Sequence, residues 1–383
     1  ATDSATIAKN KPVFTVVKQN PITSIKDQNR SGTCWAYSTL SYFESEILKH
    51  TGKTYDLSEM FVANKTYMDR ATMAVRMHGD VSFSQGGSAY DVLYALQHYG
   101  IVPEGAMPAP GTLTGDSLAN FGEFFDVMTP YVEAVAKSNA KKISSAWKSG
   151  LQGIIDSYIG KTPEKFTYQG KQYTPQSFCQ SLGLNLDDYV TITSYTHHPM
   201  WSKFAVEVQD NWRWPLSYNV PMDDLCKIID NAINNGYTIA WGGDVTEDGF
   251  TRKGLGIAYD VKKVRSMAGT DADHWFKLSK DEKKEKFDSL GVNAPEVVPT
   301  QAMRQEAFDN WETTDDHGMH IYGIAKDQNG KEYYMVKNSW GEYGDYKGTW
   351  YMTKAFVAYK TMDFMVNKNA IPKDLSLIHI SEP

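Results

Sequence analysis

The order in which helical and extended patterns follow one another constrains the fold of this chain more than any other feature. Residues 34–51 carry apolar side chains at spacings of four, three and four, which predicts a helix that ends before Gly52. Residues 317–351 contain short aromatic and β-branched runs separated by Gly- and Asp-rich turns, which predicts strands. Helices and strands that are segregated along the chain in this way are typical of an α+β fold.

Two further helical regions precede the middle of the chain. A helix is predicted after Gly86-Gly87, with Ser88 as its N-cap. Residues 111–182 are polar and helical in pattern, and Pro130 is expected to break one long helix there.

The middle of the chain mixes both patterns. Strands are predicted at 190–199 and 204–212, and residues 221–245 predict a helix followed by a buried strand. Residues 260–312 are charged and are expected to be rich in loops. Within them, the run at 280–288 is expected to form a solvated helix face.

The composition excludes some classes of function. The chain has 39 Lys and Arg against 46 Asp and Glu, a net charge of −7, so we expect no nucleic-acid partner. No apolar run is long enough to predict a membrane span. Three cysteines, Cys34, Cys179 and Cys226, are too few for a disulfide framework in a chain of 383 residues.

Both ends of the sequence carry an expectation. The chain begins Ala1-Thr2-Asp3 without methionine, which would fit a periplasmic or secreted protein if a leader had been removed. Residues 376–383 match no periodicity upstream. We expect them to be a cloning or sequencing artefact outside the fold.

Metal and phosphate chemistry has little support in the sequence. On a helix His317 and His320 would share a ligand shell, but in a strand residues of odd separation point to opposite faces. His197 and His198 are better explained as a loop pair or a packing feature. Because no zinc-binding spacing and no phosphate-binding loop occurs, we expect no metal and no cofactor.

A cysteine nucleophile is the stronger alternative. Such a nucleophile needs a base, a group that orients the base, and donors for the developing oxyanion. Cys34 leads a predicted helix, where free N–H groups favour an anion, and His317 begins a strand. Asn338 follows another strand, and Gln28 offers a side-chain amide on the loop before the helix. Each residue alone has an ordinary structural explanation, and only their joint presence favours catalysis.

Three segments resemble the signatures of papain-like cysteine peptidases. They are Q-x5-C-W from Gln28 to Trp35, DHGMHIYG from Asp316 to Gly323 and NSWG from Asn338 to Gly341. Two softer matches, LSEM at residues 57–60 and Gly86-Gly87 before a helix, agree with them. The resemblance covers roughly residues 14–370.

The number of residues between the signatures indicates which branch of the family the chain resembles. Cys34 and His317 are 283 residues apart, and the middle segments resemble the bleomycin hydrolase/aminopeptidase C branch, which carries large insertions. The resemblance implies a papain-like two-lobed fold with a helical left lobe, a β-barrel-like right lobe and a large, mostly helical insertion. The expected parts are an arm and helical lobe with the nucleophile (1–104), the insertion with interspersed strands (105–300), and a β lobe with the base and the orienting Asn (301–375).

The resemblance also implies an activity, which is hydrolysis of peptide bonds through a thioester, with removal of N-terminal residues. Cys34 would be the nucleophile, held as a thiolate by His317, and Asn338 would orient that imidazole. Gln28 and the backbone N–H of Cys34 would stabilise the oxyanion.

Other positions receive smaller roles. The resemblance implies that Trp340 shields the His317–Asn338 hydrogen bond and that Gly86-Gly87 let a substrate backbone approach. His320 is expected to be a buried or network histidine, and Cys226 a core residue. Asp315 and Asp316 are expected to hydrogen-bond locally.

The family further implies peptide substrates, a cytoplasmic location and a homohexamer with active sites facing an inner channel. In this branch the C-terminal tail lies in the cleft, where its carboxylate anchors the free amine of the substrate. Whether residues 371–375 reach the cleft here is left open by the sequence.

Two other functions are kept as alternatives to the peptidase. A catalytically silent papain-like protein would act as a scaffold or binding protein, although all four catalytic positions are present. An acyl transferase with a Cys-His-Asp site is the other rival, against which the Asn338-Ser339-Trp340-Gly341 context argues.

Overall fold

The computed structural model describes residues 4–110, 118–267 and 272–375. A mixed sheet of eleven strands forms the centre, in the order β5-β6-β4-β13-β7-β10-β11-β12-β9-β8, with β1 paired to β10. The strands of this sheet are β1 (Thr15–Gln19), β4 (Tyr189–Thr193), β5 (Lys203–Phe204), β6 (Ser217–Asn219), β7 (Ile239–Gly243), β8 (Phe250–Thr251), β9 (Leu255–Gly256), β10 (His317–Lys326), β11 (Glu332–Lys337), β12 (Thr349–Thr353) and β13 (Thr361–Asn367).

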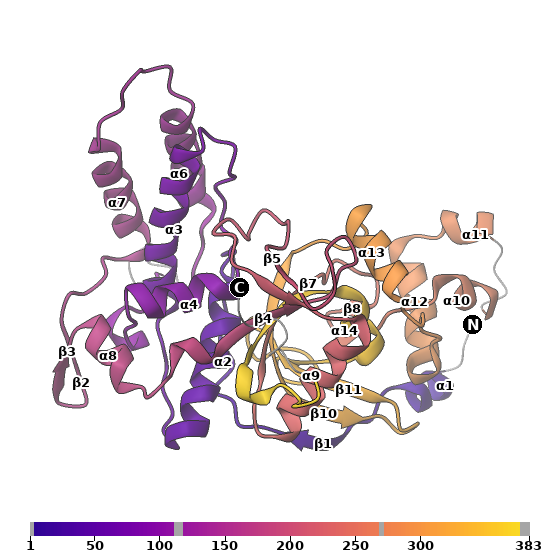
Figure 1. Cartoon of the computed structure of the whole chain (residues 1–383). Coiled ribbons are helices and arrows are strands. Elements are labelled where there is room, and N and C mark those ends of the chain that lie inside the picture. The colour runs from indigo at the N-terminus through magenta and orange to yellow at the C-terminus, as the bar shows by residue number, and fades with distance from the viewer. Residues whose placement is uncertain (1–3, 111–117, 268–271, 376–383) are drawn as a thin grey trace.

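Helices cover this sheet and extend beyond it on two sides (Figure 1). One group, with α3, α6 and α7 at its upper end in the figure, contains α2 (Cys34–Thr51), α3 (Glu59–Arg76), α4 (Ala89–His98), α6 (Gly122–Ala136), α7 (Ala146–Ile159) and α8 (Pro175–Ser181). The other helices are α1 (Ser4–Asn10), α9 (Met222–Asn234), α10 (Val261–Met267), α11 (Ala272–Lys277), α12 (Lys280–Leu290), α13 (Gln301–Asp309) and α14 (Lys354–Lys360).

Strand β10 separates two hydrophobic cores because its side chains alternate between the faces of the sheet. Met319 and Ile321 are fully buried in a core built with α9 and the neighbouring strands. His320 points to the opposite face, where it bonds Ser41 of α2. Strand β10 therefore packs between α9 and α2, and its N-terminal end lies beside the start of α2.

The helix predicted from Cys34 is confirmed, since α2 runs from Cys34 to Thr51. The apolar positions of its predicted stripe are completely buried, and they are Ala36, Leu40, Phe43 and Ile47. The strands predicted from residue 317 are confirmed as β10, β11 and β12. The helix and strand predicted within 221–245 are α9 and β7.

The prediction that Pro130 breaks a helix is wrong. Pro130 lies inside α6, which continues to Ala136. A proline inside a helix costs about 3 kcal/mol. Here Met128 and Val132 flank Pro130 and are at most 1% exposed, so packing of the helix against its neighbours outweighs that cost.

Three other expectations change in detail. The expected strand at 204–212 is limited to Phe204 in β5, and the rest is a loop that lines a cavity. The region 111–182 contains the hairpin β2 (Phe166–Tyr168) and β3 (Lys171–Tyr173), whose two-residue Gln-Gly turn was a usable signal. Residues 260–312 are more helical than expected, although the charged run does form α12.

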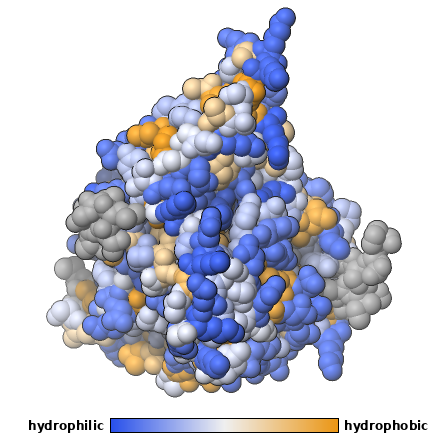
Figure 2. All heavy atoms as spheres, turned by 90° about the vertical axis from the view of Figure 1, so that its left-hand side faces the viewer, coloured by the Kyte–Doolittle hydropathy of each residue, from blue (hydrophilic) through white to orange (hydrophobic). Residues whose placement is uncertain are grey.

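The strand path through the described residues has two ends, at β5 and β8, so the sheet is open and forms no closed barrel. No helix among the described residues is long and apolar enough to cross a membrane. The surface seen from the side of α6 and α7 is largely hydrophilic (Figure 2). Residues 376–383, expected to be an artefact, lie outside the described residues.

Candidate active site

Cys34 is the first residue of α2, and the start of this helix has no side-chain cap. Thr33 occupies the N-cap position, but its hydroxyl bonds the Ser31 hydroxyl at 2.6 Å. The first backbone N–H groups of a helix have no partner within the helix and attract anions. The local sequence therefore leaves donors available beside the Cys34 sulfur.

His317 begins β10, and its imidazole is held by Asn338, which directly follows β11. The distance from Nε2 of His317 to Oδ1 of Asn338 is 2.8 Å. The backbone N–H of Ser339 donates to the same Oδ1 at 2.8 Å, which identifies this atom as the oxygen of the amide. Nε2 must therefore carry a proton, and Nδ1 is the nitrogen left to act as a base.

Trp340 packs beside this pair. Its ring centroid lies 4.9 Å from that of His317, with the planes inclined by 32°. His317 is only 7% exposed, so the hydrogen bond to Asn338 is largely removed from water. This arrangement supports the shielding role expected for Trp340.

Cys34 and His317 line one cavity of about 150 Å³. The backbone approaches closely here, because a Cβ atom on Gly318 would lie 2.8 Å from the Ser38 hydroxyl of α2. Only glycine allows β10 to meet the first turns of α2 in this way. Among the described residues no hydrogen bond joins the Cys34 sulfur to the imidazole, whereas the backbone N–H groups of Gly318 and Trp35 act to lower the pKa of the thiol.

Burial favours the neutral form of both groups. Burial raises the pKa of the Cys34 thiol to about 12, opposed by the N–H groups of Gly318 and Trp35. Burial lowers the pKa of His317 to about 4, opposed by the bond to Asn338. A proton passed from sulfur to imidazole would create two opposite charges that stabilise each other. The resting thiolate that the resemblance implies is thus not favoured by burial alone and stays a prediction.

Gln28 is buried beside the loop that leads to Cys34. Its Nε2 donates to the Ser31 carbonyl at 2.7 Å, and its Oε1 accepts from the Ser339 hydroxyl at 2.6 Å. Since a primary amide has two N–H bonds, one remains for a ligand. Gln28 does not itself line the cavity of Cys34 and His317, so its predicted oxyanion role stays a prediction.

Gly86 and Gly87 line the cavity of Cys34 and His317. A Cβ on Gly86 would lie 2.2 Å from an oxygen of Asp210, and one on Gly87 would lie 2.6 Å from the Trp35 ring. The carbonyl of Gly86 accepts from Arg70 at 2.7 Å. Close packing within the protein therefore already requires these glycines, whatever a substrate does.

The sequence interpretation missed the carboxylates of this cavity. Asp315 was expected to hydrogen-bond locally, but its side chain has no hydrogen bond among the described residues and lines the cavity with Asp210 and Asp363. Residues two apart in an extended segment share a face, so the position of Asp315 relative to His317 was a usable signal. Asp316 does bond locally, accepting from the Thr314 hydroxyl at 3.1 Å, and it also accepts from the N–H of the distant Val245 at 2.8 Å.

The other histidine and cysteine of the prediction lie away from the cavity. His320 is fully buried, and its Nδ1 is 2.8 Å from the Ser41 hydroxyl. Cys226 belongs to α9 and packs partly buried against the core, and burial raises its pKa to about 11.

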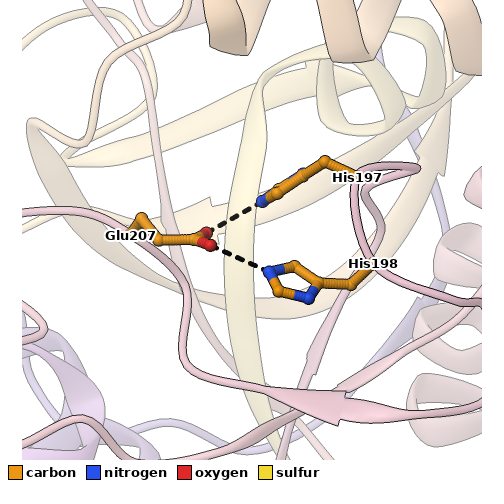
Figure 3. A group of neighbouring side chains, drawn as sticks. All are labelled: His197, His198 and Glu207. Atoms are coloured by element: carbon orange, nitrogen blue, oxygen red, sulfur yellow. Dashed lines mark hydrogen bonds and ion pairs between the residues drawn. The ribbon is translucent and has the colours of Figure 1, made fainter.

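His197, His198 and Glu207 form a second cluster (Figure 3). Both histidines direct Nε2 at the carboxylate, with distances of 2.9 and 2.8 Å. Gln305 accepts from the Thr196 N–H and turns its own N–H₂ toward Nδ1 of His197, at 3.1 Å. Nδ1 is therefore an acceptor and Nε2 carries the proton, which is the reverse of what a metal ligand at Nε2 requires. The cluster acts as a hydrogen-bonded link between two loops, as expected for a packing feature.

A cysteine at a helix start that shares a cavity with a His–Asn pair on a neighbouring sheet defines the papain-like class of cysteine peptidases. The chain belongs to the Peptidase C1-like family, whose sequence model matches residues 1–311 and 293–383. The family match confirms that the resemblance seen in the sequence is real.

Relatives cover nearly the whole chain. Aminopeptidase G of Lactobacillus delbrueckii subsp. lactis is 23% identical over 95% of this chain and 85% of its own length. Bleomycin hydrolase of Rattus norvegicus is 22% identical over 99% of this chain and 88% of its own length. A crystal structure of PepW from Lactobacillus rhamnosis HN001 aligns with a TM-score of 0.69 at 19% identity, over 99% of this chain and 87% of that one. These relatives confirm the bleomycin hydrolase/aminopeptidase C branch.

Proposed function

We propose that the chain hydrolyses peptide bonds with Cys34 as nucleophile and His317 as base. The observation that carries this proposal is that both side chains line one cavity while Asn338 holds Nε2 of the imidazole at 2.8 Å. That bond leaves Nδ1 to accept the thiol proton. The Nε2–H tautomer is thus the one that a base in this position needs.

The reaction runs through a thioester. His317 takes the proton of Cys34, and the sulfur attacks the peptide carbonyl carbon. The protonated imidazole then gives its proton to the leaving amine, and the carbonyl carbon remains bonded to sulfur. Water, deprotonated by the same imidazole, hydrolyses the thioester and restores the thiol.

The oxyanion that forms in both steps needs fixed donors. The N–H of Cys34 is one, because no described hydrogen bond uses it and no side chain caps the helix. The second N–H of Gln28 is the other, on an amide that Ser31 and Ser339 hold in place. Removal of one such donor typically costs about 3–4 kcal/mol of barrier.

Removal of N-terminal residues is the narrower proposal, supported by the names of the relatives. Residues near the C-terminus are expected to anchor the substrate amine in this branch. Ile371 and Leu375 instead pack against the core beside α9, and neither lines the cavity of Cys34 and His317. Up to residue 375, the described C-terminal segment therefore supplies no anchor for the amine in this cavity.

One experiment tests both the peptidase and the aminopeptidase proposal. It compares hydrolysis of a fluorogenic aminoacyl substrate that has a free amine with hydrolysis of its N-acetylated form. Cleavage of either substrate by the wild type, abolished in Cys34→Ala, supports the peptidase. Cleavage of the free-amine substrate alone supports aminopeptidase action. Absence of any cleavage by folded wild-type protein would favour the silent scaffold.

The remaining expectations, from the family resemblance and from the net charge, belong to the same proposal. They are a helical lobe and a β lobe, the division at residues 104, 300 and 375, and a homohexamer without nucleic-acid binding. Sedimentation at micromolar concentration tests the assembly, because a hexamer of 43.1 kDa chains separates clearly from a monomer. Titration with duplex DNA at physiological salt tests the absence of nucleic-acid binding.

A further inference from the structure

Four carboxylates without a role in the proposed reaction line the cavity of Cys34 and His317. They belong to Asp210, Asp315, Asp316 and Asp363, of which Asp316 accepts hydrogen bonds from the Val245 N–H and the Thr246 hydroxyl. Only Asp210 has a cationic partner in contact, Arg70, whose Nη1 lies 2.9 Å from Oδ1. Asp315 and Asp363 have no hydrogen bond or ion pair in the part of the chain that the structure describes.

Among the cavity carboxylates that have no described hydrogen bond, Asp315 is the closest to the base along the chain. It precedes His317 by two residues, so both side chains can turn to the same side of an extended backbone. Burial, and after it the charges of Asp210 and Asp363, hold the pKa of Asp315 well above its usual range. Burial also raises the pKa of Asp363 to about 7, opposed by Arg304. Negative charge therefore outweighs positive charge around Asp315.

No cation is in contact with Asp315 among the described residues. Arg70 is fully buried and divides its donors among Asp210, Ser82 and the carbonyl of Gly86. Arg304 directs Nε and Nη1 to the carbonyls of Ser194 and Ala358, and its buried Nη2 has no hydrogen-bond partner among the described residues. A cation that pairs directly with Asp315 would therefore come from a ligand.

A second observation points to a ligand at the same place. His317 is 7% exposed and lines this cavity, and among the described hydrogen bonds its Nδ1 has no partner. Asp210, Asp315 and Met362 also line a neighbouring hollow of about 720 Å³. The carboxylates therefore stand between the catalytic pair and the space from which a substrate would extend.

We infer that Asp315, supported by Asp210 and Asp363, binds a cationic group of the substrate beside the scissile bond. Asp315 is then a specificity-determining residue. The inference rests on the proposed peptidase function and names its substrate class, which is a peptide with an ammonium or guanidinium group near the bond that is cut. Two sources share this chemistry, the free α-amine of a substrate or a Lys or Arg side chain.

Four fluorogenic peptides separate the sources. The first pair has a neutral side chain and either a free or an acetylated amine. The second pair is N-acetylated and carries Arg or its neutral isostere citrulline within two residues on the acyl side of the bond. Wild-type protein should cleave at least one cationic member with a kcat/KM about ten- to a hundredfold above that of its neutral partner.

Asp315→Asn should remove most of that preference, because kcat/KM for the cationic peptides should fall toward that for their neutral partners in the same variant. Asp315→Glu should retain part of it. Asp309→Asn is the matched control, since Asp309 lines only the neighbouring hollow, where it bonds Gln305. This control should keep the full preference.

The outcomes are distinguishable. Equal kcat/KM for cationic and neutral peptides in the wild type overturns the inference and leaves the peptidase intact. An undiminished preference in Asp315→Asn also overturns it. Absence of cleavage of all four peptides by the wild type overturns the proposed function itself. If Asp315→Asn does not fold, the wild-type comparison still decides, because it needs no variant.

Discussion

The hydroxyl of Ser339 donates a hydrogen bond to Oε1 of Gln28 at 2.6 Å, across 311 residues of sequence. The backbone N–H of Ser339 also donates to Oδ1 of Asn338. One residue therefore fixes the orientation of two amides, that of the proposed oxyanion donor and that of the group holding His317. The two halves of the proposed machinery are joined at this point.

Ser339→Ala should lower kcat/KM about three- to tenfold, because one neutral hydrogen bond contributes about 0.5–1.5 kcal/mol. The effect should act through Gln28, because the variant keeps the backbone N–H that orients Asn338. In a Gln28→Ala background the same substitution should therefore cost much less. Full additivity of the two substitutions in steady-state kinetics would contradict the proposed coupling.

Gln28→Ala should reduce kcat about a hundredfold or more while leaving KM nearly unchanged, since an oxyanion donor acts mainly in the transition state. Steady-state kinetics with one peptide substrate suffices to measure it. A kcat within threefold of wild type would remove Gln28 from the oxyanion hole.

Gly318→Ala should destabilise the protein by about 1–3 kcal/mol, because the added Cβ meets the Ser38 hydroxyl at 2.8 Å and forces α2 and β10 apart. Activity should fall with it. Gly153→Ala is the matched control, since nothing lies within 4 Å of its added Cβ in α7, and alanine favours a helix by about 0.8–1.0 kcal/mol. Urea unfolding of both variants measures the difference, and equal stabilities would contradict the packing described.

Asp363→Asn should change the pH dependence of stability. Because burial raises the pKa of this carboxyl from 3.8 to about 7, the folded protein binds its proton more tightly than the unfolded chain does. Its contribution is present at pH 4 and is lost as the pH rises toward 7, by up to about 4 kcal/mol. The variant should lose less stability than wild type between pH 4 and pH 8 in urea unfolding. Parallel pH profiles for the two proteins would contradict the burial of an uncompensated carboxyl.

Local patterns made part of this site predictable. The apolar stripe after Cys34 predicts the helix α2, and the alternating side chains after His317 predict the strand β10. Each functional residue is the first residue of its element. Neither pattern reports which strands become neighbours. Strand β7 lies between β10 and β13, and no local feature of residues 239–243 indicates those partners.

The carboxylates of the cavity illustrate the limit. Asp315 could have been found, since it lies two residues before His317 in an extended segment. Asp210 and Arg70 could not, because they meet across 140 residues and neither belongs to a recognisable pattern. Pro130 shows the opposite failure, in which a strong local preference yields to packing of α6.

The rate at which iodoacetamide labels Cys34 at pH 7 tests most directly whether His317 activates this sulfur. In wild type, labelling of Cys34 should be stoichiometric and much faster than that of Cys226. In His317→Ala, where burial still raises the pKa of the thiol and no imidazole takes its proton, labelling should slow at least a hundredfold and then rise about tenfold per pH unit up to pH 10. Equal rates in the two proteins at pH 7, or a wild-type Cys34 no faster than Cys226, would contradict the account.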